Sequence, residues 1–215
     1  MTDIPRVPGK GALQESAVGF LTSGISAGLM ASLAMVTKMP FIFPSLGATV
    51  FLLFYRSDAS AASPRNTLVG HFIGVVAGLA ALALTGLLHN ESAFIEGMTW
   101  PRVVATALSL ALTTAAMTGF RIAHPPAGAT TLIVSLGLLS TPLEVLTLCG
   151  AIGLTILVAR VTHYAFGTPY PAWRPFDELE KAAMKKANAA AEANANAELS
   201  DDEDEAEFDG DSVPN

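Results

Sequence analysis

The chain has 215 residues, of which 51% are apolar and 14% are charged, and its mean hydropathy is +0.47. Because charged residues make up about a quarter of an ordinary soluble domain, this composition excludes that class and indicates a membrane protein without a nucleic-acid partner. The formal charge of -7 is not spread evenly, because residues 177–215 hold 13 acidic and 3 basic residues. The remaining residues 1–176 are mildly basic, with a net charge of +3.

Six apolar segments follow one another along the chain. The first is an uncharged run of 21 residues, long enough to cross a hydrocarbon core of about 30 Å. Two of the six have only 15 residues each, which as plain helices span only about 22 Å. We therefore predict long segments at residues 17–37, 67–88, 103–120 and 145–159, and short ones at 41–55 and 126–140.

The two short segments share a sequence pattern. Residues 44–49 read Pro-Ser-Leu-Gly-Ala-Thr and residues 125–130 read Pro-Pro-Ala-Gly-Ala-Thr, an offset of 81 residues with differences at two positions. The same offset places the first long segment on the third, so the order long, short, long occurs twice. We expect an all-α polytopic membrane protein built from two repeats, at about residues 17–88 and 103–160, each with a short broken half-helix.

The basic residues predict how the segments are oriented. If the short segments only dip into the membrane, the basic residues of the body fall on both sides. If each completes a crossing, most of them share one side, which the enrichment of Lys and Arg in cytoplasmic loops favours. That side then carries Arg6, Lys10, Arg56, Arg65, Arg121, Arg160 and the basic residues of the C-terminal segment, whereas Lys38 and Arg102 lie opposite. Three crossings per repeat make the second repeat inverted, a plan found in many secondary transporters.

The repeated hexads are the strongest candidates for a binding site. Pro44, Pro125 and Pro126 suit the first turn of a helix, and the glycine at the same position of both hexads allows close approach of a ligand. A helix that begins inside the membrane presents free N–H groups and the positive end of its dipole, so two paired starts would bind a small anion. The expected binding residues are Ser45, Leu46, Gly47, Ala48, Thr49, Ala127, Gly128, Ala129 and Thr130. The alternative is that proline and glycine simply kink packed helices.

His124 and His71 are the ionisable residues nearest to the apolar interior. An ionisable residue at that depth suggests function, so we expect a role in gating or proton relay. The alternative for each is a structural hydrogen bond between helices. Gly70, Gly74 and Gly78 recur every four residues and predict a face for close helix packing, as do Gly24 and Gly28.

Other classes of site find no support in the sequence. The four histidines lack His-x-x-x-His spacing and there is a single cysteine, so we expect no metal site and no cofactor. The spans contain no Ser/His/Asp arrangement and no paired carboxylates, so we expect no catalytic residues and no enzyme.

Four regions are expected along the chain. Residues 1–16 form an N-terminal segment and residues 17–160 the membrane domain. Residues 161–176 are rich in aromatic residues and proline, which suits the membrane surface. Residues 177–215 form an acidic tail, with a short helix possible before residue 200 and disorder expected beyond it.

The motifs resemble those of a known family. His124-Pro125-Pro126-Ala127-Gly128-Ala129, residues 44–49, and Pro64-Arg65-Asn66 ahead of Gly70-His71 are similar to the HPP family of integral membrane proteins, over roughly residues 17–160. Members of that family in chloroplasts and cyanobacteria are regarded as nitrite transporters, so the resemblance implies transport of a small anion. The family is usually described with four spans, which differs from the six crossings that the charges favour.

The expected function is therefore a transporter or channel for a small monovalent anion, nitrite first, bound near the midplane at paired half-helix starts. We expect a homo-oligomer in the cell (inner) membrane with both termini in the cytoplasm. The alternative is a membrane scaffold or assembly protein whose acidic tail recruits a partner.

Overall fold

The structure is a computed structural model that describes residues 12–189, all of whose regular elements are helical. The chain divides into two compact units, Met1–Pro175 and Phe176–Asn215. In the second unit, residues 176–189 are helical, and the acidic run at residues 201–211 lies outside the described residues, as does the start of the N-terminal segment. The expected all-α class is confirmed for the part of the chain that the structure describes.

Four helices are long and apolar enough to cross a membrane. They have 21 to 26 residues and lie close to the predicted long segments: α1 (Ala12–Thr37), α3 (Pro64–Leu84), α5 (Trp100–Phe120) and α7 (Pro142–Ala165). The last three begin a few residues earlier than the apolar runs, because each has a proline in its first turn, where a missing N–H group costs no hydrogen bond. The chain is a multi-pass integral membrane protein.

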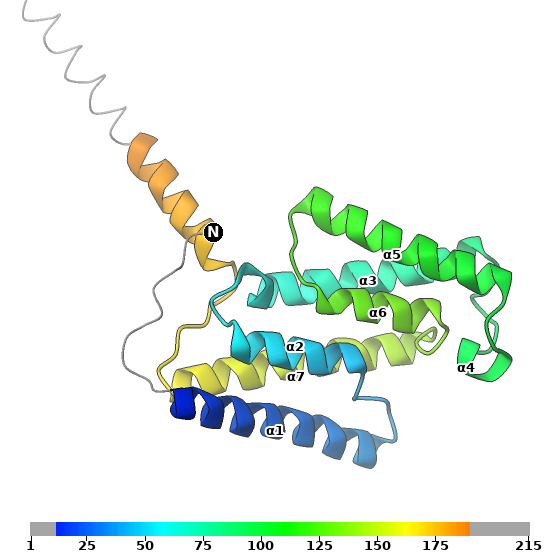
Figure 1. Ribbon diagram of the computed structural model, residues 1–215, viewed down its shortest axis with the longest axis horizontal. Helices are drawn as coiled ribbons and strands as arrows, with labels where there is room; N and C mark the ends of the chain where they lie inside the picture. Colours follow the sequence, from blue (N-terminus) through cyan, green and yellow to red (C-terminus); the bar gives the residue numbers. More distant parts are fainter. Residues whose placement is uncertain (1–11, 190–215) are drawn as a thin grey trace, which may run out of the picture. The chain divides into compact units, whose positions relative to one another are not determined.

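The two short segments are the helices α2 (Pro44–Tyr55) and α6 (Pro126–Ser135), about 18 and 15 Å long at 1.5 Å per residue. In Figure 1, α1 and α3 run in the same direction, and so do α5 and α7. Two consecutive long helices with the same direction require that the chain return between them. Each short helix, with the extended residues before it, therefore carries the chain back along the bundle. If a short segment entered and left on the same side, the long helices before and after it would instead be antiparallel.

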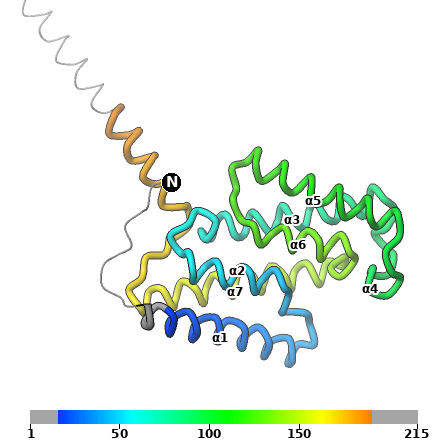
Figure 2. The backbone as a smooth tube through the Cα atoms, viewed as in Figure 1, coloured from blue at the N-terminus to red at the C-terminus, as the bar shows by residue number. Residues whose placement is uncertain are grey.

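The helices form two groups of three. Helix α3 packs against α5 and α6, α7 packs against α1 and α2, and contacts of α2 with α6 and of α3 with α7 join the groups (Figures 1 and 2). Two small elements, η1 (Ser60–Ala62) and α4 (Ala93–Glu96), lie in the connections. The start of α1 and the end of α7 lie at the same end of the bundle (Figure 2).

The predicted glycine face of α3 is confirmed as a close packing surface. A Cβ atom placed on Gly78 would lie 2.6 Å from Cβ of Val134, and one on Gly74 would lie 2.8 Å from the carbonyl oxygen of Ala127. Both neighbours belong to α6. Because these two positions of α3 have no side chain, the backbones of α3 and α6 can approach each other closely. Gly24 and Gly28 on α1 differ, because an added Cβ would meet nothing within 4 Å within this chain.

The aromatic segment after α7 is partly folded back onto the bundle. The ring of Tyr170 stacks on His163 with centroids 4.9 Å apart, and His163 stacks in turn on Phe54 at 5.5 Å. Burial raises the pKa of the Tyr170 phenol above its ordinary value. Tyr164, in the last turn of α7, is in contrast 89% exposed, as expected for a residue at a membrane surface. The segment therefore combines a packed residue with surface residues.

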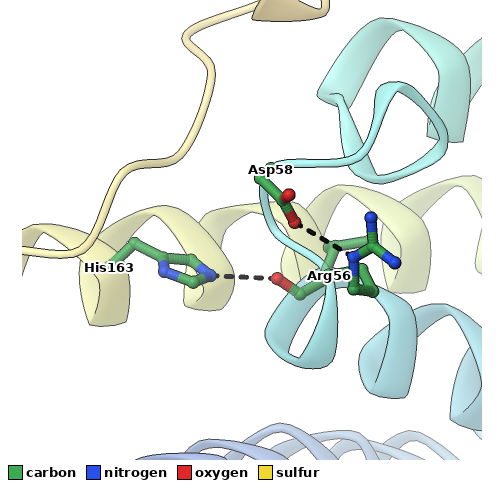
Figure 3. A network of polar contacts seen from close by, with 4 residues as sticks. Arg56, Asp58 and His163 are labelled. Carbon is green, nitrogen blue, oxygen red and sulfur yellow. Dashed lines mark hydrogen bonds and ion pairs between the residues drawn. The ribbon is translucent and has the colours of Figure 1, made fainter. Parts of the chain in front are cut away.

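Buried side chains bond the C-terminal ends of both short helices. Nε2 of His163 donates to the carbonyl oxygen of Leu53 in the last turn of α2 at 3.0 Å, beside the exposed pair Arg56 and Asp58 (Figure 3). Nη1 of Arg102, which is 1% exposed, donates to the carbonyl oxygen of Ser135 at the end of α6 at 3.3 Å. These bonds satisfy carbonyl groups that the last turn of a helix leaves free, and a cation there also stabilises the helix dipole.

Candidate functional site

The two repeated hexads contribute to one buried polar cluster through His71 on α3. Its Nε2 atom lies 2.9 Å from Oγ1 of Thr49 on α2, and its Nδ1 atom lies 2.7 Å from Oγ1 of Thr130 on α6. All three side chains are fully buried. The sequence placed these residues 22 and 59 positions apart, and the packing of α2, α3 and α6 brings them into contact.

His124, just ahead of α6, completes the cluster. Its Nε2 atom lies 3.2 Å from Nε2 of His71 and 3.3 Å from Oγ1 of Thr49. The two imidazole rings meet edge to face with centroids 4.8 Å apart. Nδ1 of His124 lies 2.8 Å from the carbonyl oxygen of Ala61 in η1. Both predicted histidines are therefore in the same site, together with the two predicted threonines.

The partners of these groups assign the hydrogens. A carbonyl oxygen only accepts, so Nδ1 of His124 donates to Ala61 and its Nε2 is an acceptor in the neutral ring. The Thr49 hydroxyl donates to the carbonyl oxygen of Ser45 at 2.9 Å, so its oxygen accepts from Nε2 of His71. Nδ1 of His71 then accepts from the hydroxyl of Thr130. Each ring holds one hydrogen, and Nε2 of His124, which carries none, lies beside the N–H group of His71 that Thr49 also accepts.

The glycine face of α3 positions His124. A Cβ atom on Gly70 would lie 2.7 Å from Cβ of His124, closer than real Cβ contacts allow. Glycine at this position therefore leaves room for His124 to lie against α3, one residue from His71. The packing face and the polar site are parts of the same arrangement.

Two further hydroxyl groups lie one helical turn from the cluster. Ser45 precedes Thr49 by four residues on α2, and Thr67 precedes His71 by four residues on α3. Both side chains are fully buried, and neither hydroxyl has a hydrogen-bond partner among the described residues. An unpaired hydroxyl in an apolar surrounding is unfavourable, so these two groups are candidates to bind a small polar ligand.

The remaining predicted binding residues have other positions. Gly47 and Ala48 are exposed on the outer face of α2, because successive residues of a helix turn by about 100° and only part of the hexad faces inward. Leu46 and Ala127 are fully buried, whereas Gly128 and Ala129 are half-buried. An added Cβ on Gly128 would meet Leu110 of α5 at 3.7 Å, so this glycine faces α5. The predicted prolines begin the short helices, with Pro44 and Pro126 in first turns and Pro125 just before α6.

The starts of the short helices offer fewer free N–H groups than expected. The N–H groups of Ala127 and Gly128 donate to the carbonyl oxygens of His124 and Pro125, each at 3.0 Å. Likewise, the N–H groups of Leu46 and Gly47 both donate to the carbonyl oxygen of Phe43. A tight turn ahead of each helix thus satisfies donors that a bare helix start would leave free. The donors of this site are therefore hydroxyl groups and imidazole rings.

Sequence reasoning missed several polar groups of α5 in the same region. Oγ1 of Thr131 lies 2.8 Å from Oγ1 of Thr113 on α5, and Thr113 in turn donates to the carbonyl oxygen of Ser109. Arg102, Ser109 and Thr113 form a buried polar line along α5. Their spacing of seven and four residues places them on one helix face, and this was the available signal. Nothing in the sequence indicated that the carbonyl oxygen of Ala61 would accept a hydrogen bond from His124.

Comparisons with known proteins agree with the membrane assignment. The HPP transmembrane region matches residues 8–171, which include every helix of the first unit. A transmembrane protein of Dictyostelium discoideum is 30% identical over 104 residues, which cover 48% of this chain and 33% of that protein. The chain thus spans about a third of the length of that curated relative. No solved structure matches.

Proposed function

This chain belongs to the HPP transmembrane family, and we propose that it carries a small monovalent anion across the membrane, with nitrite as the first candidate. The observation that supports this proposal is the buried cluster of Thr49, His71, His124 and Thr130. Polar and ionisable groups within a membrane are expensive to bury, so their presence there favours a role on a substrate pathway.

The chemistry of the cluster suits an anion. Hydroxyl and imidazole N–H groups donate hydrogen bonds, and Ser45 and Thr67 add hydroxyl groups that have no partner among the described residues. Helices α2, α3, α5 and α6 contain no Asp or Glu, so no carboxylate on them repels a negative charge. Donors without a fixed counter-charge bind a small anion weakly enough to release it, as conduction requires.

We propose that the two halves are inverted repeats with six crossings. Adding 81 to the bounds of α2 gives 125 and 136, within one residue of the bounds of α6 at each end. The same offset moves α3 to 145–165, which overlaps α7 (Pro142–Ala165). The opposite directions of α2 and α6 in Figure 1 support inversion. With α1 beginning and α7 ending on the basic side, we place both termini in the cytoplasm and the protein in the cell membrane.

We also propose a homo-oligomer. In α1 and in α5, only 17% of the most apolar 18-residue stretch is buried within the chain. The corresponding shares for α3 and α7 are 50% and 44%. Small residues of α5, including Ala107, Ala111 and Ala115, line a shallow groove on its outer side. A second copy packed there would enclose a helix that one chain leaves at the surface.

Uptake into proteoliposomes tests the proposal. The purified full-length chain is reconstituted, and stopped-flow uptake of nitrite, nitrate, formate and chloride is compared with that of empty vesicles. We expect nitrite uptake well above the empty vesicles and a rank order among the four anions. Equal rates with and without protein for all four anions would rule out anion transport.

A further inference from the structure

The paired histidines hold a hydrogen-bond arrangement that accepts one more proton. In the neutral cluster the Thr130 hydroxyl donates to Nδ1 of His71, and Nε2 of His71 carries the hydrogen. Nε2 of His124 faces Nε2 of His71 at 3.2 Å with its lone pair available. Two ring nitrogens at this separation are within hydrogen-bond distance.

The position of an added proton follows from these partners. Nδ1 of His124 keeps its hydrogen on the carbonyl oxygen of Ala61, so with one added proton the two Nε2 atoms share one hydrogen and the third hydrogen lies on Nδ1 of His71. With hydrogens on both of its nitrogens, His71 donates from Nε2 to His124 and from Nδ1 to Oγ1 of Thr130. Thr130 then accepts instead of donating. Protonation therefore releases the Thr130 hydrogen to bind something else.

We propose that this pair couples the transported anion to one proton, so that the two cross together without net movement of charge. The inference rests on the proposed anion transport and adds its co-substrate. One proton from the solution on one side binds His71, one anion accepts the released hydrogen of Thr130, and both leave on the other side. No covalent bond to the anion forms or breaks, and the cluster returns to its neutral arrangement.

The surroundings of the pair leave the anion as its counter-charge. The polar groups that contact the two rings are the hydroxyls of Thr49 from α2 and Thr130 from α6 and the carbonyl oxygen of Ala61 from η1. From α5, Met117 lies near Gly70 beside His124, and its side chain carries no charge. The charged residues of α3 and α5 are Arg65 and Arg102, both in first turns. Helices α2, α3, α5 and α6 contain no Asp or Glu, and α7, which packs against α2 and α3, has only Glu144 in its first turn, where it accepts from the N–H groups of Ser140 and Thr141. No carboxylate on these five helices therefore neutralises a protonated pair.

The pair occurs once in the chain, with His71 in the first repeat and His124 in the second. The offset of 81 residues relates His71 to Ile152 and His124 to Phe43, which are both buried and apolar. Thr49 and Thr130 correspond to each other under the same offset. Both repeats therefore have a threonine at this position, whereas neither histidine has a counterpart in the other repeat. One chain thus provides one proton site, which gives a ratio of one proton per anion.

Proton movement and voltage dependence test the coupling on the wild-type protein. Proteoliposomes of the full chain, with a pH-sensitive dye inside, receive an inward nitrite gradient at pH 8, where little nitrous acid is present to cross the lipid. Empty vesicles give the background. Potassium and valinomycin set an inside-positive potential of about 60 mV, which favours accumulation of an uncoupled monovalent anion about tenfold. We expect one proton taken up per nitrite and the same nitrite rate with and without the potential.

Two variants locate the coupling. His124→Asn keeps an N–H donor for the carbonyl oxygen of Ala61 and removes Nε2, and His71→Gln removes the second ring nitrogen of the other partner. We expect both to lose nitrite-driven proton uptake. The control is His89→Asn, which changes an exposed histidine after α3 and should leave coupling unchanged.

The possible results separate the two proposals. Wild-type nitrite flux that the potential accelerates, without proton uptake, would overturn the coupling and leave anion transport in place. Proton uptake that persists in both histidine variants would also overturn it. Flux of no anion above empty vesicles would remove both proposals.

Discussion

Each ring nitrogen of His71 and His124 has a hydrogen-bond partner, and this pairing makes the two residues tolerable at membrane depth. Leaving a buried donor or acceptor unpaired costs about 1–3 kcal/mol, whereas a satisfied network of neutral groups costs little. The partners come from three helices and one connection, so the cluster also fixes how those elements lie against one another. Its polar groups therefore serve structure and, as we propose, transport.

The Thr130 hydroxyl provides a test at this scale. Thr130→Val keeps the shape of the side chain but leaves Nδ1 of His71 without a donor. We expect a loss of about 1–3 kcal/mol in stability, seen as a lower Tm in detergent, because a buried nitrogen becomes unpaired. We also expect slower nitrite uptake in proteoliposomes, since the hydroxyl that we assign to the anion is gone.

Thr37→Val is the matched control for this substitution. Thr37 is exposed at the end of α1, and its hydroxyl donates to the carbonyl oxygen of Leu33 in its own helix. We expect wild-type uptake and nearly wild-type Tm. If Thr130→Val behaves like this control in both measurements, Thr130 has neither the structural nor the transport role assigned to it.

Among the elements, α3 owes its central position to its glycines. Gly70, Gly74 and Gly78 remove side chains from the face that meets α6 and His124, so the helix backbones approach closely. In lipid there is little hydrophobic driving force between helices, and close van der Waals contact becomes a main source of their association. The short helix α6, with only ten residues, depends on such contact for its place.

Gly78→Ala measures this contact. Its added Cβ would lie 2.6 Å from both Cβ and Cγ1 of Val134, and a β-branched side chain in a buried helix has little freedom to move away. Overpacking costs about 1–3 kcal/mol, which should outweigh the gain of about 1 kcal/mol that alanine gives in a helix. We expect a lower Tm in detergent.

Gly28→Ala on α1 makes the same chemical change where an added Cβ meets nothing within 4 Å. We expect its Tm to equal or exceed that of the wild type, because the propensity gain is then unopposed. Equal Tm values for the two variants would show that the glycine face of α3 does not determine the packing of α6.

For the whole molecule, the alternation of six segments and the separate C-terminal unit are the main features. The first unit contains all of α1 to α7, and the second begins at Phe176. The proposed pathway therefore needs residues of the first unit alone, whereas a scaffold would need the acidic tail. This division makes the two functional hypotheses separable in one experiment.

Deletion of residues 177–215 is that experiment. We expect the shortened chain to retain nitrite uptake in proteoliposomes, because Thr49, His71, His124 and Thr130 all lie in the first unit. Light scattering of the purified sample in detergent checks that the variant keeps the assembly state of the full chain. Loss of uptake with an unchanged assembly state would favour a function that depends on the tail.

Local patterns in the sequence determined much of this protein. Uncharged runs of sufficient length predicted the four long helices, prolines predicted where helices begin, and the repeated hexads marked the two short ones. Glycines at four-residue spacing predicted the packing face of α3. These features depend on neighbours along the chain, which is why they are visible without a structure.

The tertiary structure decided which of the marked residues form the site. Lipid and protein interior are both apolar, so hydropathy does not reveal which face of a membrane helix turns inward, and Gly47 and Ala48 point outward while Thr49 points in. The contacts of His71 with Thr49 and Thr130 join residues 22 and 59 positions apart, and the carbonyl partner of His124 belongs to a short connecting helix. Such contacts depend on how the helices cross, and that follows from the packing of all six segments together.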